Sequence, residues 1–272
     1  MSDASRMIGV FDSGLGGLTV LRSLIDLLPD SPVVYFGDTG RFPYGPKPAD
    51  EVLKYSVEIA ELLVERGAGL IVVACNSAAA AALDRLQAML DVPVIGVIEP
   101  GLRAAVRATR NGRVGVIGTV GTISSGAYQR AARRIGAPIE LTCAACPGFV
   151  EFVEAGDVDS DQVHVLAERL LAPVRDAAVD TLVLGCTHYP LLARTISDVL
   201  GRDVVLVESA DETAFAVREL LGPSELRPVA GPAGRRPPSR TFVTSGDVAT
   251  FRTLGSRFLG PEVVEVEAWS WS

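Results

Sequence analysis

Histidine and lysine are both scarce in this sequence of 272 residues. The only histidines are His164 and His188, too few imidazoles for a histidine-rich zinc site. The only lysines are Lys47, in a proline-flanked loop, and Lys54, in a polar helix pattern. A pyridoxal-phosphate enzyme needs a lysine for its Schiff base. The sequence therefore argues against both kinds of site.

An excess of basic residues and long apolar runs are also lacking. The chain has 25 Lys and Arg against 33 Asp and Glu, a net charge of −8, whereas phosphate binding needs a basic face. No uninterrupted apolar run approaches the roughly 18–20 residues of a bilayer span, and the opening MSDASRM shows no secretory signal. Without a signal, the four cysteines are expected to stay reduced thiols. We therefore predict a cytoplasmic protein that binds neither nucleic acid nor membrane.

Short β-branched runs alternate with longer alanine- and leucine-rich stretches of helical period. Almost continuous apolar strands between amphipathic helices are typical of parallel sheets covered on both faces, so the pattern predicts the α/β class. The expected strands are Ile8–Phe11, Val33–Phe36, Leu70–Ala74, Val94–Val97, Val114–Ile117, Leu182–Leu184, Val204–Val207 and Thr241–Thr244. The expected helices are Leu18–Leu28, Ala49–Arg66, Ala78–Leu90, Gly126–Ile135, Gln162–Arg175, Leu191–Leu200 and Val248–Phe258. The proline-, glycine- and arginine-rich segment Arg227–Arg240 is expected to be an exposed loop.

The two halves of the chain resemble each other. The strand and loop IGVFDSGLGG have a counterpart in VGVIGTVGTI, and IVVACNSAAA, with Cys75, has one in LVLGCTHYPLL, with Cys186. Any α/β chain yields similar strand ends, but the paired cysteines favour a true repeat. The repeat predicts two pseudo-symmetric doubly wound parallel-sheet domains that face each other across a cleft. We expect residues 1–98 plus 209–272 in the first domain and 99–208 in the second, with the active site between them.

Cys75 and Cys186 each follow a predicted strand and precede a predicted helix. Ligands of doubly wound sheets bind at the carboxyl ends of strands, and a helix N-terminus lowers the pKa of a thiol by favouring the thiolate. A free cysteine is otherwise often a small buried apolar residue, but two in matching positions favour a chemical role. Cys143 and Cys146 form C-A-A-C without a redox context or a second ligand pair for zinc, so we interpret them as structural or incidental thiols.

Two glycine-containing loops follow the first two predicted strands. In FDSGLGG, Thr19 stands where a dinucleotide fingerprint needs glycine or alanine, and no Walker A motif is present. The turn at Asp12 therefore suits a small carboxylate better than a nucleotide. The irregular loop GDTGRFPYG is expected to carry binding groups, although Tyr44 there fits simple packing equally well. His188 fits either an assistant of the nearby Cys186 thiol or a core imidazole.

These segments together resemble the glutamate racemases of the aspartate/glutamate racemase superfamily. The match runs in order from Ile8 to about Ser209, through FDSGLGG, GDTGRFPYG, VACNSA, GVIEP, VGVIGTVGTI and LGCTHYPLL. The resemblance implies a cofactor-independent isomerase that interconverts L- and D-glutamate. It implies that D-glutamate is supplied for peptidoglycan, and hence for cell wall biogenesis and cell shape. A cleft enzyme of this kind is also expected to be a homodimer.

The resemblance assigns roles to residues of both halves. It makes Cys186 the thiol that deprotonates L-glutamate and Cys75 the thiol that reprotonates the carbanion, with Asp12, Glu154 and His188 assisting them. The substrate-binding positions that it implies are Asp12, Ser13, Tyr44, Gly45, Asn76, Ser77, Thr119, Thr122, Thr187 and His188. This sequence departs from the family pattern in having serine for threonine at position 77. The surroundings of Glu154, CPGFVEFVEAG, also differ from the usual proline-containing stretch.

The residues themselves support a two-thiol reaction. Inversion of an α-carbon by proton transfer needs one base on each face of a planar carbanion, and two pseudo-symmetric thiols provide both. Two alternatives stay open from the sequence. One is a racemase of another acidic amino acid, such as aspartate. The other is a non-catalytic, two-lobed protein that binds a small molecule.

Overall fold

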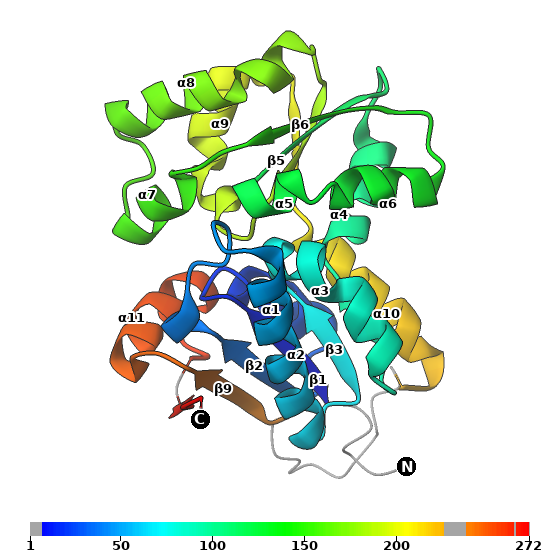
Figure 1. The fold of residues 1–272 in the computed structure, drawn as a ribbon, viewed down its shortest axis with the longest axis vertical. Coiled ribbons are helices and arrows are strands. Elements are labelled where there is room, and N and C mark those ends of the chain that lie inside the picture. The colour runs from blue at the N-terminus through cyan, green and yellow to red at the C-terminus, as the bar shows by residue number, and fades with distance from the viewer. Residues whose placement is uncertain (1–6, 226–237, 264, 272) are drawn as a thin grey trace.

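The computed structural model, which describes residues 7–225, 238–263 and 265–271, contains two α/β lobes stacked one above the other in Figure 1. Each lobe is built on its own parallel sheet, one of six strands and one of four. The predicted α/β class with two parallel-sheet domains is therefore confirmed. The domain boundaries near residues 98 and 208 stay a prediction, and the predicted loop Arg227–Arg240 lies almost wholly outside the described residues.

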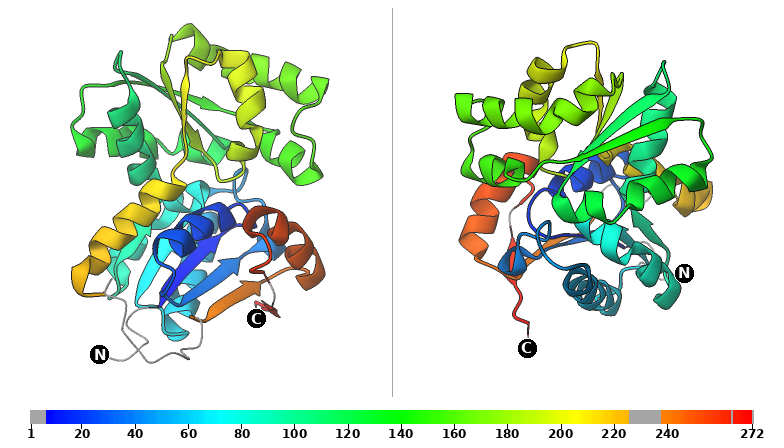
Figure 2. Two further views of the ribbon diagram at one scale, coloured as in Figure 1. Left: turned by 180° about the vertical axis from the view of Figure 1, so that it is seen from behind. Right: turned by 45° about the horizontal axis from the view of Figure 1, so that its top comes forward.

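The first sheet has the strand order β10-β9-β2-β1-β3-β4. Its strands are β1 (Ile8–Asp12), β2 (Val33–Gly37), β3 (Leu70–Val73), β4 (Val94–Gly96), β9 (Arg240–Thr244) and β10 (Val266–Ala268). The helices of this lobe are α1 (Leu18–Leu27), η2 (Thr39–Arg41), α2 (Ala49–Glu65), α3 (Asn76–Met89), α10 (Ala210–Glu225) and α11 (Val248–Leu259). Helices α2 and α3 pack together in front of the sheet in Figure 1, and α1, α10 and α11 lie in front in the reverse view of Figure 2. Every residue of β1, β2 and β3 is buried, because helices cover both faces.

The second sheet has the order β6-β5-β7-β8. Its strands are β5 (Arg113–Gly118), β6 (Glu140–Ala145), β7 (Thr181–Gly185) and β8 (Val205–Val207). The helices of this lobe are α4 (Ile98–Ala108), α5 (Val120–Ser124), α6 (Ala127–Ile135), α7 (Phe149–Ala155), α8 (Asp161–Asp176), η3 (Tyr189–Leu192) and α9 (Ala193–Leu200). Helices α4 and α6 form one packed pair, and α8 and α9 form another.

The two sheets repeat one strand order. The inner part of the first sheet, β2-β1-β3-β4, has the same arrangement as β6-β5-β7-β8, with β1 matching β5 and β3 matching β7. Cys75 follows β3 and Cys186 follows β7, so the two cysteines occupy corresponding places in the two lobes. The sequence repeat is therefore a structural repeat, and it brings the carboxyl ends of both sets of strands to the space between the lobes.

Several elements lie outside the sequence-based expectation. The patterns do not predict the edge strands β6 and β10, and they miss helices α4, α5 and α10. Strand β6 has one buried residue, and β10 has three residues and none buried, so neither carries the apolar run of a central strand. Within the described ranges no helix is both long enough and apolar enough to cross a membrane.

Candidate active site

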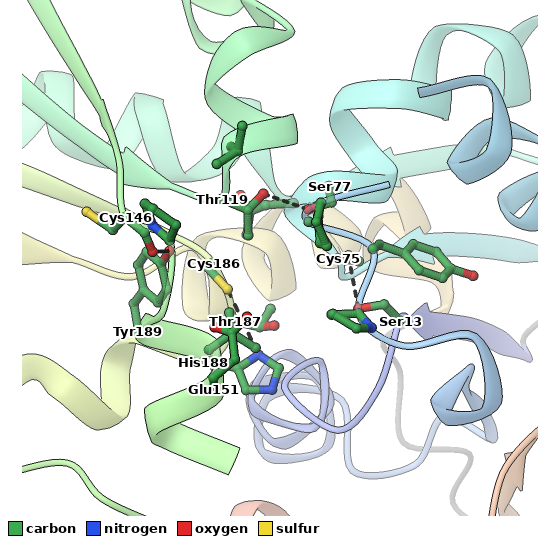
Figure 3. Close-up of a pocket in the computed structure, with 18 of the residues that line it drawn as sticks. Ser13, Cys75, Ser77, Thr119, Cys146, Glu151, Cys186, Thr187, His188 and Tyr189 are labelled. Carbon is green, nitrogen blue, oxygen red and sulfur yellow. Dashed lines mark hydrogen bonds between the residues drawn. The ribbon is translucent and has the colours of Figure 1, made fainter. Parts of the chain in front are cut away.

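A cavity lies between the lobes, and both cysteines face it (Figure 3). Cys75 and Ser13 come from the first lobe, whereas Cys186 and His188 come from the second. Ten of the residues expected in the site line this cavity: Ser13, Tyr44, Gly45, Cys75, Asn76, Ser77, Thr119, Cys186, Thr187 and His188.

Cys75 is a buried thiol at the start of α3. Its sulfur lies 3.6 Å from the hydroxyl oxygen of Ser13. Burial and the nearby charge of Asp12 raise the pKa of Cys75 to about 12, although the N–H of Ala78 and contacts with Ser13 oppose the rise. The expectation that the helix N-terminus gives this thiol a low pKa is therefore wrong, because the loss of hydration outweighs the helix end. At neutral pH Cys75 holds its proton.

Cys186 has a different environment. It is followed by η3, a short 3-10 helix, so the α-helical N-terminus expected directly after it is not found. Its sulfur lies 3.9 Å from Nδ1 of His188, and Nε2 of His188 lies 2.6 Å from Oε1 of Glu154. Burial lowers the pKa of His188, but the hydrogen bonds with Cys186 and Glu154 outweigh it and raise the pKa to about 10. His188 is therefore an imidazolium beside Cys186 at neutral pH.

Three expected site residues stand behind the cavity wall. Asp12 is fully buried, and its carboxyl group accepts from the N–H of Gly14 at 2.8 Å and from the hydroxyl of Thr187 at 3.3 Å. Burial raises the pKa of Asp12, against the opposing charge of His188 and the neighbouring N–H groups. Each of the three contacts a residue that does line the cavity: Asp12 contacts Thr187, Thr122 contacts Ser77 and Thr119, and Glu154 contacts His188. Direct contact of Asp12 and Thr122 with a substrate, and the assisting role of Glu154, stay predictions.

The hydroxyls of the two lobes also meet at the cavity. Ser77 Oγ lies 2.9 Å from Thr119 Oγ1, and the N–H of Gly121 donates to the carbonyl of Gly45 at 3.0 Å. Tyr128 of the second lobe donates to Oδ1 of Asn76 at 2.9 Å. These contacts hold the two lobes together around the cavity.

Comparison with known proteins agrees with this geometry. The sequence matches the family described as Asp/Glu/hydantoin racemase over residues 8–217. The chain belongs to the Asp/Glu/hydantoin racemase family. A glutamate racemase from Beutenbergia cavernae is 52% identical over 275 residues, which cover 98% of this chain and 93% of that protein.

Solved structures give the same result for the fold of this racemase-family protein. It is similar to the crystal structure of a glutamate racemase isoform from Bacillus anthracis, with a TM-score of 0.88, 40% identity and coverage of 98% and 97% of the two chains. It is also similar to a glutamate racemase from Francisella tularensis in complex with D-glutamate, with a TM-score of 0.87, 33% identity and coverage of 98% of each chain. The resemblance inferred from the sequence motifs is therefore confirmed.

Some residues that line the cavity of this racemase-family protein were not expected from the sequence. Besides Phe42, Pro43, Pro46 and Val120, they belong to the stretch from Cys146 to Glu151 and to Tyr189, whose hydroxyl donates to the carbonyl of Cys146 at 3.0 Å. Burial raises the pKa of Cys146 to about 12 and that of Cys143 to about 11, so both are neutral thiols at neutral pH. The sequence signal that could have located this stretch is the turn Cys146–Gly148. It follows β6 and therefore lies at the same sheet edge as the cysteine loops.

Tyr44 lines the cavity of this racemase-family protein, but its hydroxyl is engaged elsewhere. It donates to the carboxyl group of Asp38, and burial together with that neighbour raises the pKa of Tyr44 well above its usual range. Within the part of the chain that the structure describes, no group of three or more His, Cys, Asp or Glu side chains is placed to hold a metal ion.

Proposed function

We propose that this protein interconverts L- and D-glutamate by a two-thiol acid/base mechanism without a cofactor. The observation that carries the proposal is that Cys75 and Cys186, one from each lobe, line a single small-molecule cavity. A planar carbanion between them would have one sulfur on each face. The names of the similar proteins, which are glutamate racemases, support glutamate as the substrate.

The electrostatics of the site favour different resting roles for the two thiols. Cys75, with its pKa of about 12, keeps a proton to give. Cys186 lies beside the His188 imidazolium, whose positive charge stabilises negative charge that forms on the sulfur. In the L-to-D direction Cys186 takes the α-proton and Cys75 delivers one to the opposite face. In the reverse direction the roles exchange.

Deprotonation of the α-carbon is the difficult step. The α-proton of an amino acid is more than about ten pKa units less acidic than a thiol, which is a gap of about 14 kcal/mol. Preorganised donors that stabilise charge on the α-carboxylate meet most of such a gap. Asn76 supplies one, because its buried Nδ2 has no hydrogen-bond partner among the described residues and the side chain lines the cavity. The hydroxyls of Ser77, Thr119 and Thr187 supply others.

The deciding experiment measures racemisation of glutamate by the purified protein with no added cofactor. The wild-type protein should convert either enantiomer to a mixture of both, and the double variant C75S/C186S should have no activity. Aspartate is assayed in parallel by the same loss of optical rotation. If the protein racemises aspartate but not glutamate, the substrate is aspartate and the proposal for glutamate is wrong. Binding of glutamate by the wild type without turnover would favour the non-catalytic binding protein instead.

The biological setting is part of the proposal. D-glutamate formed in the cytoplasm would supply peptidoglycan synthesis and so sustain the cell wall and cell shape. We further propose that the active form is a homodimer. Light scattering coupled to size-exclusion chromatography tests this directly, since a monomer at assay concentrations would contradict it.

A further inference from the structure

A buried carboxyl group supports the wall of the cavity from outside. Asp38 follows β2 and is fully buried. One of its oxygens accepts from Arg41 Nε at 2.7 Å and from the hydroxyl of Tyr44, and the other accepts from Ser245 at 2.6 Å and from the indole N–H of Trp271 at 3.2 Å. A buried carboxylate needs such a set of donors, because unpaired it would be strongly destabilising.

Arg41 links this carboxyl group to two aromatic rings. Its guanidinium lies 3.9 Å from the ring centre of Tyr55 on one side and 3.9 Å from that of Trp271 on the other. It also pairs with Glu58 at 2.5 Å. A guanidinium between two rings gains cation–π attraction on both faces. Trp271 therefore touches both members of the Arg41–Asp38 pair, stacking on one and donating to the other.

Tyr44 connects this cluster of Asp38, Arg41 and Trp271 to the cavity. The segment from Phe42 to Pro46 lines the cavity, and within it the Tyr44 hydroxyl is tied to Asp38. The next residue, Gly45, accepts the N–H of Gly121 from the opposite lobe, and a Cβ atom built on Gly45 would lie 2.8 Å from Thr119. The position of this segment is therefore set on the outside by Asp38 and on the inside by close contact with the second lobe.

We propose that Trp271 is a positioning residue, which holds Asp38 and Arg41 and thereby fixes the Phe42–Pro46 segment against the substrate. This proposal rests on the proposed function, because it takes glutamate as the substrate. Trp271 contributes no atom to the cavity. Its loss leaves the two thiols and the His188–Glu154 pair in place and loosens one wall. Substrate affinity should therefore fall, whereas the proton-transfer step should be spared.

Two matched substitutions isolate the indole N–H. Trp271→Phe keeps a ring over Arg41 but removes the donor to Asp38. Trp269→Phe makes the same change two residues earlier, where the buried indole N–H has no hydrogen-bond partner among the described residues. Loss of one hydrogen bond to a charged group predicts that W271F raises the KM for glutamate about fivefold, with kcat within about twofold of wild type. W269F should match the wild type in both.

Trp271→Ala removes the stacking as well, so its KM should rise further than that of W271F. Amide hydrogen exchange of Phe42, Tyr44 and Gly45 should be faster in both Trp271 variants and unchanged in W269F, a readout that does not depend on the substrate. If W271F and W269F behave alike in KM and in exchange, the proposal is wrong. It is also wrong if W271A lowers only the melting temperature. Should W271A not fold, the comparison of the two phenylalanine variants decides. Absence of glutamate turnover in the wild type would reject the proposed substrate, and the exchange data would still test the positioning role.

Discussion

Oε1 of Glu154 lies 2.6 Å from Nε2 of His188, on the side of the imidazole away from Cys186. Glu154 itself does not line the cavity, whereas His188 does. In the proposed mechanism the carboxylate acts through the imidazole, by holding it in its charged form and in a fixed orientation. This relationship shows how Glu154, on helix α7, is connected to the site without lining the cavity.

Replacing Glu154 with glutamine should lower the pKa of His188. The amide oxygen still accepts a hydrogen bond, but the negative charge that favours the imidazolium is gone, so the pKa should fall from about 10 toward the 6.5 of a free imidazole. The imidazole then loses its proton at lower pH, and the alkaline limb of the pH–rate profile should move to lower pH with it. NMR titration of His188 measures the shift, with the second histidine, His164, as an internal reference.

Glu154→Asp is the matched variant, because it keeps the charge on a shorter side chain. We expect the pKa of His188 in this variant to lie between those of the wild type and of E154Q. At pH 8 the rate of E154Q should be reduced by about tenfold, the usual size of a general acid–base contribution at its lower end. An unchanged His188 titration in E154Q would show that Glu154 does not set the charge of the imidazole.

The two cysteines should differ in which enantiomer they act on. Cys75→Ser and Cys186→Ser should each abolish racemisation, because one face of the carbanion then lacks its acid/base. In heavy water, C75S retains Cys186 and should slowly exchange the α-proton of L-glutamate, whereas C186S should exchange that of D-glutamate. Proton NMR of the α-position follows both reactions.

The outcome that contradicts the two-thiol mechanism is full racemase activity in either single variant. Exchange of the opposite enantiomer in each variant would reverse the assignment of the thiols to the two faces. The C75S/C186S protein is the control for exchange that does not depend on either sulfur.

The central part of the fold could be predicted because its signals are local. Strands such as Ile8–Asp12 are almost entirely apolar and end at glycine-rich loops. The sequence therefore predicts both that the strand forms and where its carboxyl end lies. Edge strands lack that signal. β6 (Glu140–Ala145) begins with a charged residue and buries one side chain. β10 has three residues, none of them buried, and joins the sheet only by pairing with β9.

The site could be predicted in half of its lining residues but not in its charges. Motifs located Cys75, Cys186 and eight other lining residues, because loops after parallel strands share one edge. The pKa of Cys75 depends on burial by the opposite lobe and on Asp12, neither of which a linear pattern contains. The support of Tyr44 by Trp271 joins residues more than two hundred positions apart, through Asp38. Such relationships need the three-dimensional structure.

Asp12 should control the acidity of Cys75. The negative charge of Asp12 is the second cause, after burial, of the raised pKa of that thiol. Asp12→Asn keeps an oxygen that accepts from Gly14 and removes the charge, so the pKa of Cys75 should fall below about 12 and the thiolate fraction at a given pH should rise. Alkylation of Cys75 by iodoacetamide, followed by mass spectrometry of its peptide across pH 8–10, should therefore be faster in D12N.

Cys143 is the internal control for that measurement, because burial alone raises its pKa. Its alkylation rate should be the same in D12N and in the wild type. Equal acceleration of both cysteines would indicate a loosened protein rather than an electrostatic effect, and no acceleration of Cys75 would show that Asp12 does not influence it.

Gly16 should be intolerant of even one added methyl group. A Cβ atom built there would lie 2.7 Å from Nδ1 of His188 and closer still to the hydroxyl of Thr187, so Gly16→Ala must displace both from the opposite lobe. Displacement of a catalytic group by about 1 Å costs on the order of a hundredfold in rate, and we expect kcat to fall by about that factor. Gly255→Ala is the matched control, since its Cβ would meet Leu18 at 3.3 Å within the first lobe and touch no residue of the cavity. Steady-state kinetics and melting temperatures of both variants decide the matter: wild-type kcat in G16A would mean that the lobes can separate there without moving His188.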